Sequence, residues 1–575
     1  MCYAQPTPFQ PRITIWDLPE EIHILIFRFC MQNRYHDLNL VGRNRDRDIQ
    51  AAVELVKLSH VCSAWRGILL CNRRFWTRVD MRNGDRLRAF VERSGTLPLS
   101  LFISCNVTGV PTMRNIVASE RDRIRRLDIV VHDTDLEIYD ELGDFEFAAG
   151  APLECLAITY ENLNMHFHHD SDFFLLGRKI LPMVALAIVP LSGRFPTTHF
   201  PNLTYLYLGT TLKFGRDRLP VKLSWSLLDL LHNTPKLEFL SLLGIGDGGR
   251  GLANDRSPAL KLPVPLNRLR SLVFTDGDLA TISTVLQHLS MPETALVRIH
   301  QVDAARSQVL PTLPRLSALR SIDRLSLTTE QTHLQMVAEG ASSGLWLQGR
   351  ILKFRRHRDE DDDIVTWNWT VWLSKLPTFL PLGQVTCLDI YVGMHHGIVP
   401  NLLQHMVGLE EFSIRLRHQD ERLGGSPELS LVRIVYRLLT QEDPLLCPNL
   451  QVLNIDVDGA YGNTTPDLYP DDLRTMVMCR VRIGHPIRTI RIQPFADQNI
   501  ADPNWFGSID IAERLDKLKA DVDCVKLLRP GHPTIRYECA RWAKWHIDGA
   551  ERYWNREMEE IEYVTPWNEE EESYP

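Results

Sequence analysis

The 575-residue chain lacks paired cysteines and a large excess of charge of either sign. Its eleven cysteines include no Cys-x-x-Cys pair, which argues against a disulfide framework or a zinc site and favours a reducing intracellular compartment, cytoplasmic and/or nuclear. The 64 basic and 72 acidic residues give a net charge of −8. We therefore expect neither nucleic acid nor an anionic membrane as a partner.

Long apolar runs are also missing. The longest, Ile180 to Pro190, is far shorter than the roughly 20 residues of a transmembrane helix. The start of the sequence has no basic segment followed by an apolar one, so we expect no secretory signal. A chain of this length is too long to fold around one compact hydrophobic core. The length therefore predicts several domains or an elongated repeat array.

Motifs for catalysis are sparse. The sequence has no Walker loop and no His-Glu-x-x-His run. His166, His168, His169 and Asp170 form the one candidate metal cluster, but no further ligand is evident nearby, and a solvated loop is the favoured interpretation. We expect no cofactor, no metal and no catalytic residue.

The first eighty residues predict a small helical bundle. Residues 15–31 (IWDLPEEIHILIFRFCM) predict a first helix that Asp17 is placed to cap and that ends near Cys30 or soon after. Residues 35–50 are polar and predict an inserted loop. A second helix follows from apolar residues at helical spacing, with Phe75 and Trp76 folding back onto it. The apolar positions of the two helices are Ile22, Leu25, Ile26, Phe29, Leu55, Leu58, Val61, Cys62, Trp65, Ile68 and Leu69.

Periodicity leaves two interpretations of these apolar side chains open: they pack only on one another, or part of them forms an interface. The motifs LPEEI (18–22), LSHVCSAWRGIL (58–69) and FW (75–76), followed by a short apolar strand at Val79, resemble an F-box over residues 14–82. The resemblance implies binding to a Skp adaptor protein. Ten residues match its motif positions, and the resemblance implies that they bind the adaptor: Leu18, Pro19, Ile22, Ile26, Leu58, Val61, Cys62, Trp65, Ile68 and Trp76.

A phrase of the form apolar-x-x-apolar-x-apolar recurs along the rest of the chain. Such repetition predicts stacked units that share one core. Each unit is a short strand, after which the chain returns over the outer face of the array. Residues 225–236 and 279–292 have helical spacing between two such phrases. Clear copies start at residues 124, 153, 183, 203, 237, 269, 322, 385, 409, 450 and 487, with weaker ones near 294 and 349.

Residues 83–510 thus resemble a degenerate leucine-rich-repeat array, an α/β solenoid with parallel strands on its concave side and helices outside. A different layered α/β domain is the alternative. Side chains that alternate with the apolar anchors are expected on the open concave face, where they bind a target protein. These candidates are Tyr205, Tyr207, Phe239, Tyr391, Arg415, Asp456 and Arg491.

The ends of the chain depart from the repeat pattern. Residues 511–565 have helical spacing and predict a helical cap of the array. Residues 566–575 form an acidic tail, and residues 1–13 an N-terminal tail. The tryptophans of TWNWTVW (366–372) are expected to pack between repeats, with sugar stacking as the less favoured alternative.

Taken together, the two resemblances imply the substrate-recognition subunit of a Skp, cullin and F-box ubiquitin ligase, in which catalysis belongs to other subunits. The irregular repeats are similar to those of the expanded F-box families of mushroom-forming fungi. A scaffold that binds proteins without degrading them is the first alternative, and an enzyme centred on the His cluster is the second. Binding to a cullin would separate the ligase from the scaffold.

Overall fold

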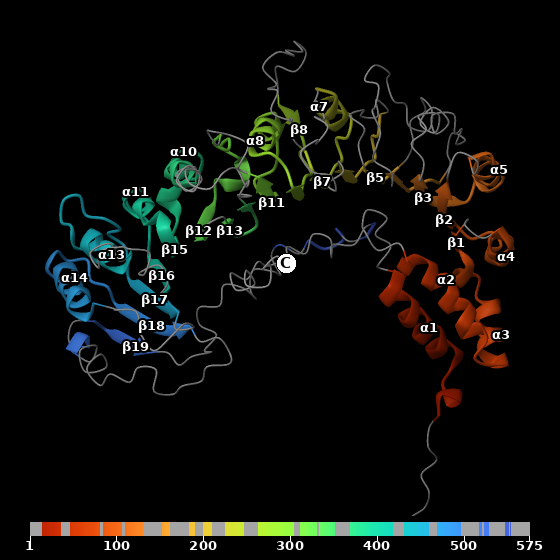
Figure 1. Cartoon of the computed structure of the whole chain (residues 1–575), viewed down its shortest axis with the longest axis horizontal. Coiled ribbons are helices and arrows are strands. Elements are labelled where there is room, and N and C mark those ends of the chain that lie inside the picture. Colours follow the sequence, from red (N-terminus) through yellow and green to blue (C-terminus); the bar gives the residue numbers. More distant parts are fainter. Residues whose placement is uncertain are drawn as a thin grey trace, which may run out of the picture. The chain divides into compact units, whose positions relative to one another are not determined.

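The computed structural model describes residues 14–35, 46–80, 84–105, 110–131, 152–160, 183–189, 199–209, 225–245, 263–303, 311–330, 333–350, 369–417, 431–458, 469–495, 517–519, 522–527, 545, 547–550 and 552–553. It is a mixed α/β structure with a helical N-terminal region and a large, mostly parallel sheet (Figure 1). The chain divides into two compact units. Unit 1 comprises residues 1–166, 173–189 and 549–560, and unit 2 the rest.

Unit 1 begins with short helices. They are η1 (Ile15–Asp17), α1 (Glu20–Tyr35), α2 (Asp46–Ser59), α3 (Ser63–Cys71) and η2 (Arg73–Trp76). Asp17 closes the turn before α1, where its Oδ2 accepts hydrogen bonds from the backbone N and the Oγ1 of Thr14, both at 2.8 Å. The pKa of the Asp17 carboxyl group is lowered because these bonds stabilise its charged form.

Two sequence-based boundaries in this region were wrong. The loop expected over residues 35–50 is shorter, because α1 ends at Tyr35 and α2 begins at Asp46; residues 36–45 lie outside the described part. The expected second helix is two helices, broken between Ser59 and Ser63. At the break, Cys62 is the N-cap of α3 and its Sγ accepts a hydrogen bond from the backbone N of Trp65 at 3.3 Å. Apolar spacing continues across this break, so periodicity alone did not reveal it.

A small aromatic core holds the helices together. The Phe27 ring lies edge-on to the rings of Trp65 (4.9 Å) and Phe75 (6.4 Å). Trp76 donates a hydrogen bond from Nε1 to the backbone O of Leu69 at 2.8 Å and packs edge-on against Phe90 of α4 (Gly84–Ser94) at 4.9 Å. Trp76 therefore connects the bundle with α4.

Five parallel strands complete unit 1. They are β1 (Arg78–Asp80), β2 (Leu99–Cys105), β3 (Ile124–Val131), β4 (Cys155–Tyr160) and β5 (Ala185–Val189), each paired with the next, and α5 (Val110–Glu120) connects β2 to β3. Leu101, Leu127, Leu156 and Leu186 are aligned in register across β2 to β5 and are fully buried. Regular pairing of this kind places one leucine per strand on the same buried row.

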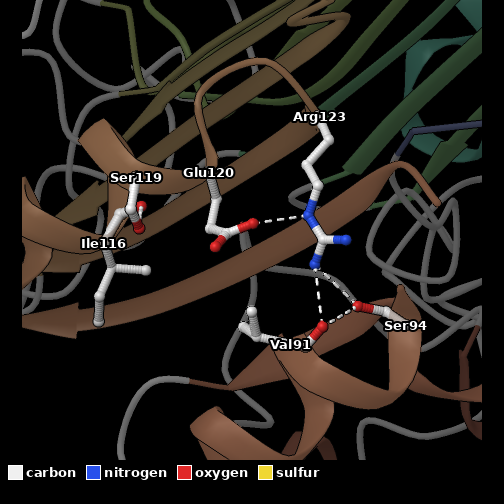
Figure 2. Close-up of polar contacts among 6 residues, drawn as sticks. All are labelled: Val91, Ser94, Ile116, Ser119, Glu120 and Arg123. Atoms are coloured by element: carbon white, nitrogen blue, oxygen red, sulfur yellow. Dashed lines mark hydrogen bonds and ion pairs between the residues drawn. The ribbon is translucent and has the colours of Figure 1, made fainter. Parts of the chain in front are cut away.

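Arg123, which precedes β3, ties the end of α4 to these strands (Figure 2). Its Nη2 donates to the backbone O of Val91 at 3.1 Å and to the Oγ of Ser94 at 2.8 Å, and its Nε pairs with the Oε2 of Glu120 at 2.7 Å. Carbonyl groups in the last turn of a helix need such outside donors. Arg123 thus holds α4 and the loop between α5 and β3 together.

We predict that Arg123→Ala lowers the local stability of α4. Loss of these donors should cost about 1 to 2 kcal/mol, which corresponds to roughly five- to thirtyfold faster amide exchange. Hydrogen exchange of peptides covering residues 84–94 in the full chain measures the effect. Arg121→Ala is the control, because Arg121 is exposed and, among the described residues, pairs with its exposed neighbour Asp122, at 3.7 Å. Equal exchange in both variants would contradict a stabilising role of the Arg123 contacts.

Most strands of unit 2 form two runs in which each strand pairs in parallel with the next strand of the same run. One run is β6 (Tyr205–Gly209), β7 (Phe239–Leu243), β9 (Ser271–Thr275) and β11 (Leu296–Asp303). A second run is β15 (Cys387–Tyr391), β16 (Glu411–Arg417), β17 (Val452–Asp458), β18 (Thr489–Phe495) and β19 (Cys524–Leu527). The short strands β8 (Val264–Pro265) and β10 (Leu289–Ser290) form a separate parallel pair.

Helices cover one face of the unit 2 strands (Figure 1). They are α7 (Trp225–His232), α8 (Leu279–Gln287), α10 (Leu376–Phe379), α11 (Val399–His405), α13 (Leu431–Thr440) and α14 (Pro470–Arg482). The described part of unit 2 also has short turns: η4 (Ser317–Leu319), η5 (Leu382–Gln384), which precedes β15, and η6 (Gly393–Ile398), which leads into α11. The helices expected within residues 225–236 and 279–292 are confirmed as α7 and α8.

An antiparallel insertion separates the two parallel runs. The strands β12 (Ile322–Glu330), β13 (His333–Gly340) and β14 (Gly344–Arg350) follow one another, but β14 pairs with β11 and β12 with β15, so that β13 lies antiparallel between them. Gly349 is required there, because a Cβ atom would lie 2.5 Å from Trp369. Trp369 and Trp372 are buried, whereas Trp367 lies outside the described part.

All eleven clear copies of the recurring phrase coincide with a strand, from β3 to β18. The β13–β14 insertion was not predicted, because the weak copy near 349 begins as β14 ends. The parallel pairing also continues past residue 510, to β19. Of the expected helical cap only a few residues are described, and the tails 1–13 and 566–575 lie outside the described part.

Candidate functional site

Helix α1 has apolar side chains on two sides. His23 and Phe27 face the bundle and are buried, whereas Ile22, Leu25 and Phe29 are exposed, Phe29 to 62%. The latter three follow the i, i+3, i+7 spacing that places side chains on one face of a helix. The apolar stripe read from the sequence is therefore real, but Ile22, Leu25 and Phe29 do not pack into the core.

Large exposed apolar side chains concentrate in this region. Of the eleven in the described part of the chain, seven lie between residues 15 and 70, and we call these the exposed apolar set: Ile15, Trp16, Ile22, Leu25, Phe29, Val61 and Leu70. Apolar residues scattered singly on a surface need no explanation, whereas their concentration on one small domain is typical of an interface.

Trp65 links the exposed apolar set to the core. Its ring lies 6.3 Å from the exposed ring of Trp16 and 4.9 Å from the buried ring of Phe27. The Trp65 Nε1 is buried and has no acceptor among the described residues. Trp65 is half-buried, so its truncation would disturb the core and the surface together.

The ten residues matched to the F-box motif divide into three groups. Pro19, Ile22 and Val61 are exposed, and six are half-buried: Leu18, Ile26, Leu58, Cys62, Trp65 and Ile68. Trp76 is 1% exposed and lies under α4, with the Arg93 guanidinium 4.4 Å from its ring centre. The expectation that Trp76 contacts a partner was therefore wrong. Sequence matching missed Trp16, Leu25 and Phe29, although Leu25 and Phe29 belonged to the predicted apolar stripe.

The seven residues expected on an open sheet face are less exposed than predicted. Arg415 and Arg491 are half-buried, whereas Tyr205, Tyr207, Phe239, Tyr391 and Asp456 are buried. Tyr205 and Phe239 stack face to face across β6 and β7 at 4.6 Å, which illustrates how neighbouring parallel strands cover each other's side chains. Their role in target binding remains a prediction.

Polar groups on β16, β17 and β18 form a connected row. Asn454 Nδ2 donates to Glu411 Oε1 at 2.7 Å and to Ser413 Oγ at 2.9 Å, and Arg491 Nη1 lies 3.6 Å from Glu411 Oε1. Asp456 is buried, and its Oδ1 has no hydrogen-bond partner within the described ranges. Burial raises the pKa of Asp456 to about 7, with Arg415 lowering it and Asp389 raising it.

This pKa makes stability depend on pH. Between about pH 4, where an unfolded aspartate titrates, and about pH 7, the folded chain binds a proton that the unfolded chain has lost, so stability falls as the pH rises. We predict that Asp456→Asn, which stays neutral, gains stability relative to wild type between pH 4 and pH 8, on the order of 3 kcal/mol.

Thermal unfolding of both full-length proteins at pH 4 and pH 8 measures this difference. The exposed Asp323 provides the matched control, and Asp323→Asn should follow wild type at both values. A melting-temperature difference between Asp456→Asn and wild type that is the same at pH 4 and pH 8 would contradict the raised pKa.

The described residues show no arrangement of side chains typical of a catalytic or metal site. They contain no group of three or more potential metal ligands, and residues 165–170 with the His cluster lie outside them. Within the same ranges, every helix is too short or too polar to cross a bilayer. Eight cysteines whose side chains the structure describes are free thiols, and burial raises the pKa of Cys155 and of Cys447 to about 12.

Two glycine patterns typical of cofactor or catalytic sites were overlooked in the sequence. Residues 244–249 match Gly-x-Gly-x-x-Gly after β7, but the next described element is the strand β8, not the helix that a dinucleotide site needs. Residues 340–344 match Gly-x-Ser-x-Gly, but they form the turn between the antiparallel strands β13 and β14. A nucleophile serine of this motif requires a strand-to-helix turn, which is not present here.

Comparison with known proteins agrees with the N-terminal geometry. Residues 1–93 match the family described as F-box-like domain, a range that takes in the helices α1 to α3 and almost all of α4. No curated protein matches the chain. F-box domains typically bind Skp-type adaptors and act in protein–protein interaction. Residues 1–93, with their exposed apolar set, are therefore an F-box-like domain, which supports the assignment of the chain as an F-box protein.

Proposed function

We propose that the chain is the substrate-recognition subunit of a Skp, cullin and F-box ubiquitin ligase. Its F-box-like domain binds a Skp-type adaptor, and through it a cullin, by means of the exposed apolar set. The remaining chain binds a target protein. The observation that carries the proposal is the concentration of exposed apolar side chains on a domain of this family.

The energetics favour a partner over an isolated domain. Fully burying one large apolar side chain contributes about 1.5 to 3 kcal/mol, so covering Trp16, Leu25 and Phe29 alone offers several kcal/mol before the cost of association. Aromatic anchors typically dominate such interfaces. A partner that binds only the folded domain also stabilises it by mass action.

The strands after the F-box-like domain are proposed to be a degenerate leucine-rich-repeat-like solenoid of the fungal type, which holds the target. The chain itself is not an enzyme in this proposal. Its contribution is proximity, because it brings the target close to a ubiquitin-charged enzyme in the same complex. The free thiols of the described residues suit the reducing cytoplasm or nucleus, where this ligase would act.

We predict that Phe29→Ala in the full-length chain weakens adaptor binding roughly thirtyfold, since loss of an aromatic anchor costs about 2 kcal/mol. Val61→Ala should weaken it about fivefold. Isothermal titration with a purified Skp-type adaptor measures both. Because Phe29 and Val61 are exposed, their truncation should leave the fold intact.

Val407→Ala is the matched control, because Val407 is 56% exposed, as Val61 is, but belongs to unit 2. Its affinity for the adaptor should equal that of wild type. Equal affinities in all three variants would contradict the proposed surface. Adaptor binding without co-purification of a cullin would instead favour a scaffold that does not degrade its targets.

A further inference from the structure

Positive charge is concentrated between residues 63 and 95, although the chain as a whole is acidic. This stretch has eight arginines, no lysine and three acidic residues, whereas all 575 residues together carry a net charge of −8. It contains α3, η2, β1 and α4 of unit 1. A local surplus of one sign on a chain of the opposite overall sign concentrates a positive potential at this part of the surface.

Three exposed arginines lie where η2 packs against α4, and we call them the basic surface: Arg73, Arg74 and Arg93. The Arg73 side chain lies against Gly95, the residue after α4, where a Cβ atom would be 3.0 Å from its Nη1. The Arg93 guanidinium lies over the Trp76 ring of η2, 4.4 Å from the ring centre. Both contacts hold these arginines at the junction of η2 with the end of α4.

The arginines of the basic surface have no carboxylate partner in the described part of the chain. By contrast, Arg125 and Arg552 of the same unit both pair with Glu154, at 3.1 and 3.2 Å. Arginine is enriched at protein interfaces, where its planar group binds a carboxylate through two parallel hydrogen bonds. The basic surface therefore offers unused donors to an acidic partner.

The basic surface continues the exposed apolar set. Leu70 belongs to that set, and the exposed Arg66 precedes it by one turn of α3. Arg73 and Arg74 follow Leu70 within four residues. A protein interface typically has an apolar centre and a polar, charged rim. A partner that covers Leu70 is therefore within reach of the arginines beside it.

We propose that the basic surface binds an acidic surface of the Skp-type adaptor and speeds its association with the chain. The inference rests on the proposed function and deepens it, because it names the charge that the adaptor carries opposite η2 and the end of α4. A chain with a net charge of −8 would otherwise repel an acidic partner. Exposed charges of this kind act mainly on the association rate, and physiological salt screens them beyond roughly 8 Å.

Stopped-flow binding of a purified Skp-type adaptor to the full-length chain, at about 0.05 M and about 0.5 M salt, tests the inference. Arg73→Glu/Arg74→Glu should associate about tenfold more slowly than wild type at the low salt concentration. At the high concentration the difference should shrink to about twofold, because salt screens the charges. The dissociation rate should change much less than the association rate.

Arg268→Glu/Arg437→Glu is the matched control, because both arginines are exposed in unit 2 and the change in net charge is the same. This variant should associate at the wild-type rate. Arg73→Gln/Arg74→Gln carries the test if the charge-reversed variant does not fold, and it should associate about threefold more slowly than wild type at low salt.

Association of the folded Arg73 and Arg74 variants at the wild-type rate, or an equal loss in the control, overturns the inference. The adaptor contact of the proposed function still stands in that case, because wild type binds. Tight binding of a short DNA duplex that the charge reversal abolishes would also overturn the inference, since the surface would then be a nucleic-acid site. If wild type does not bind the adaptor at all, the proposed function and the inference fail together.

Discussion

Helix α1 carries apolar side chains on two sides, and the small helical bundle has room to bury only one of them. Phe27 packs between Trp65 and Phe75, whereas Phe29, two positions further on, points away and remains exposed. A domain of this size has little core of its own. The apolar surface left over is therefore available to a partner, and the proposed place of the chain in a ubiquitin ligase depends on it.

The sequence predicted the elements of this domain better than their orientation. Spacing identified the stripe Ile22, Leu25 and Phe29, yet an exposed stripe and a buried one look the same in a sequence. Trp76 illustrates the reverse case: a match to a motif position suggested an interface, but its indole bonds to Leu69 and packs on Phe90 of a later helix. Such contacts depend on tertiary structure, which periodicity does not contain.

The strand array shows a similar division. Each clear phrase became a strand because its apolar residues fall on alternate positions and align in register with those of the neighbouring strands, as Leu127 and Leu156 do. The antiparallel strand β13 was not foreseen, because nothing in a local pattern sets which strand will lie beside it. That insertion brings Glu339 of β13 opposite Gly344 of β14, and Trp545 packs beside them, with its ring 5.6 Å from that of Trp346 and its Nε1 donating to Glu339 Oε1 at 2.8 Å.

Oxidative footprinting of the full-length chain, free and saturated with a Skp-type adaptor, tests the central claim most directly. In the free chain, the exposed Trp16 and Phe29 should be oxidised readily and the buried Trp76 slowly. The account predicts that the adaptor protects Trp16 and Phe29 and leaves Trp76 unchanged. Adaptor binding that leaves the oxidation of Trp16 and Phe29 unaltered would contradict it.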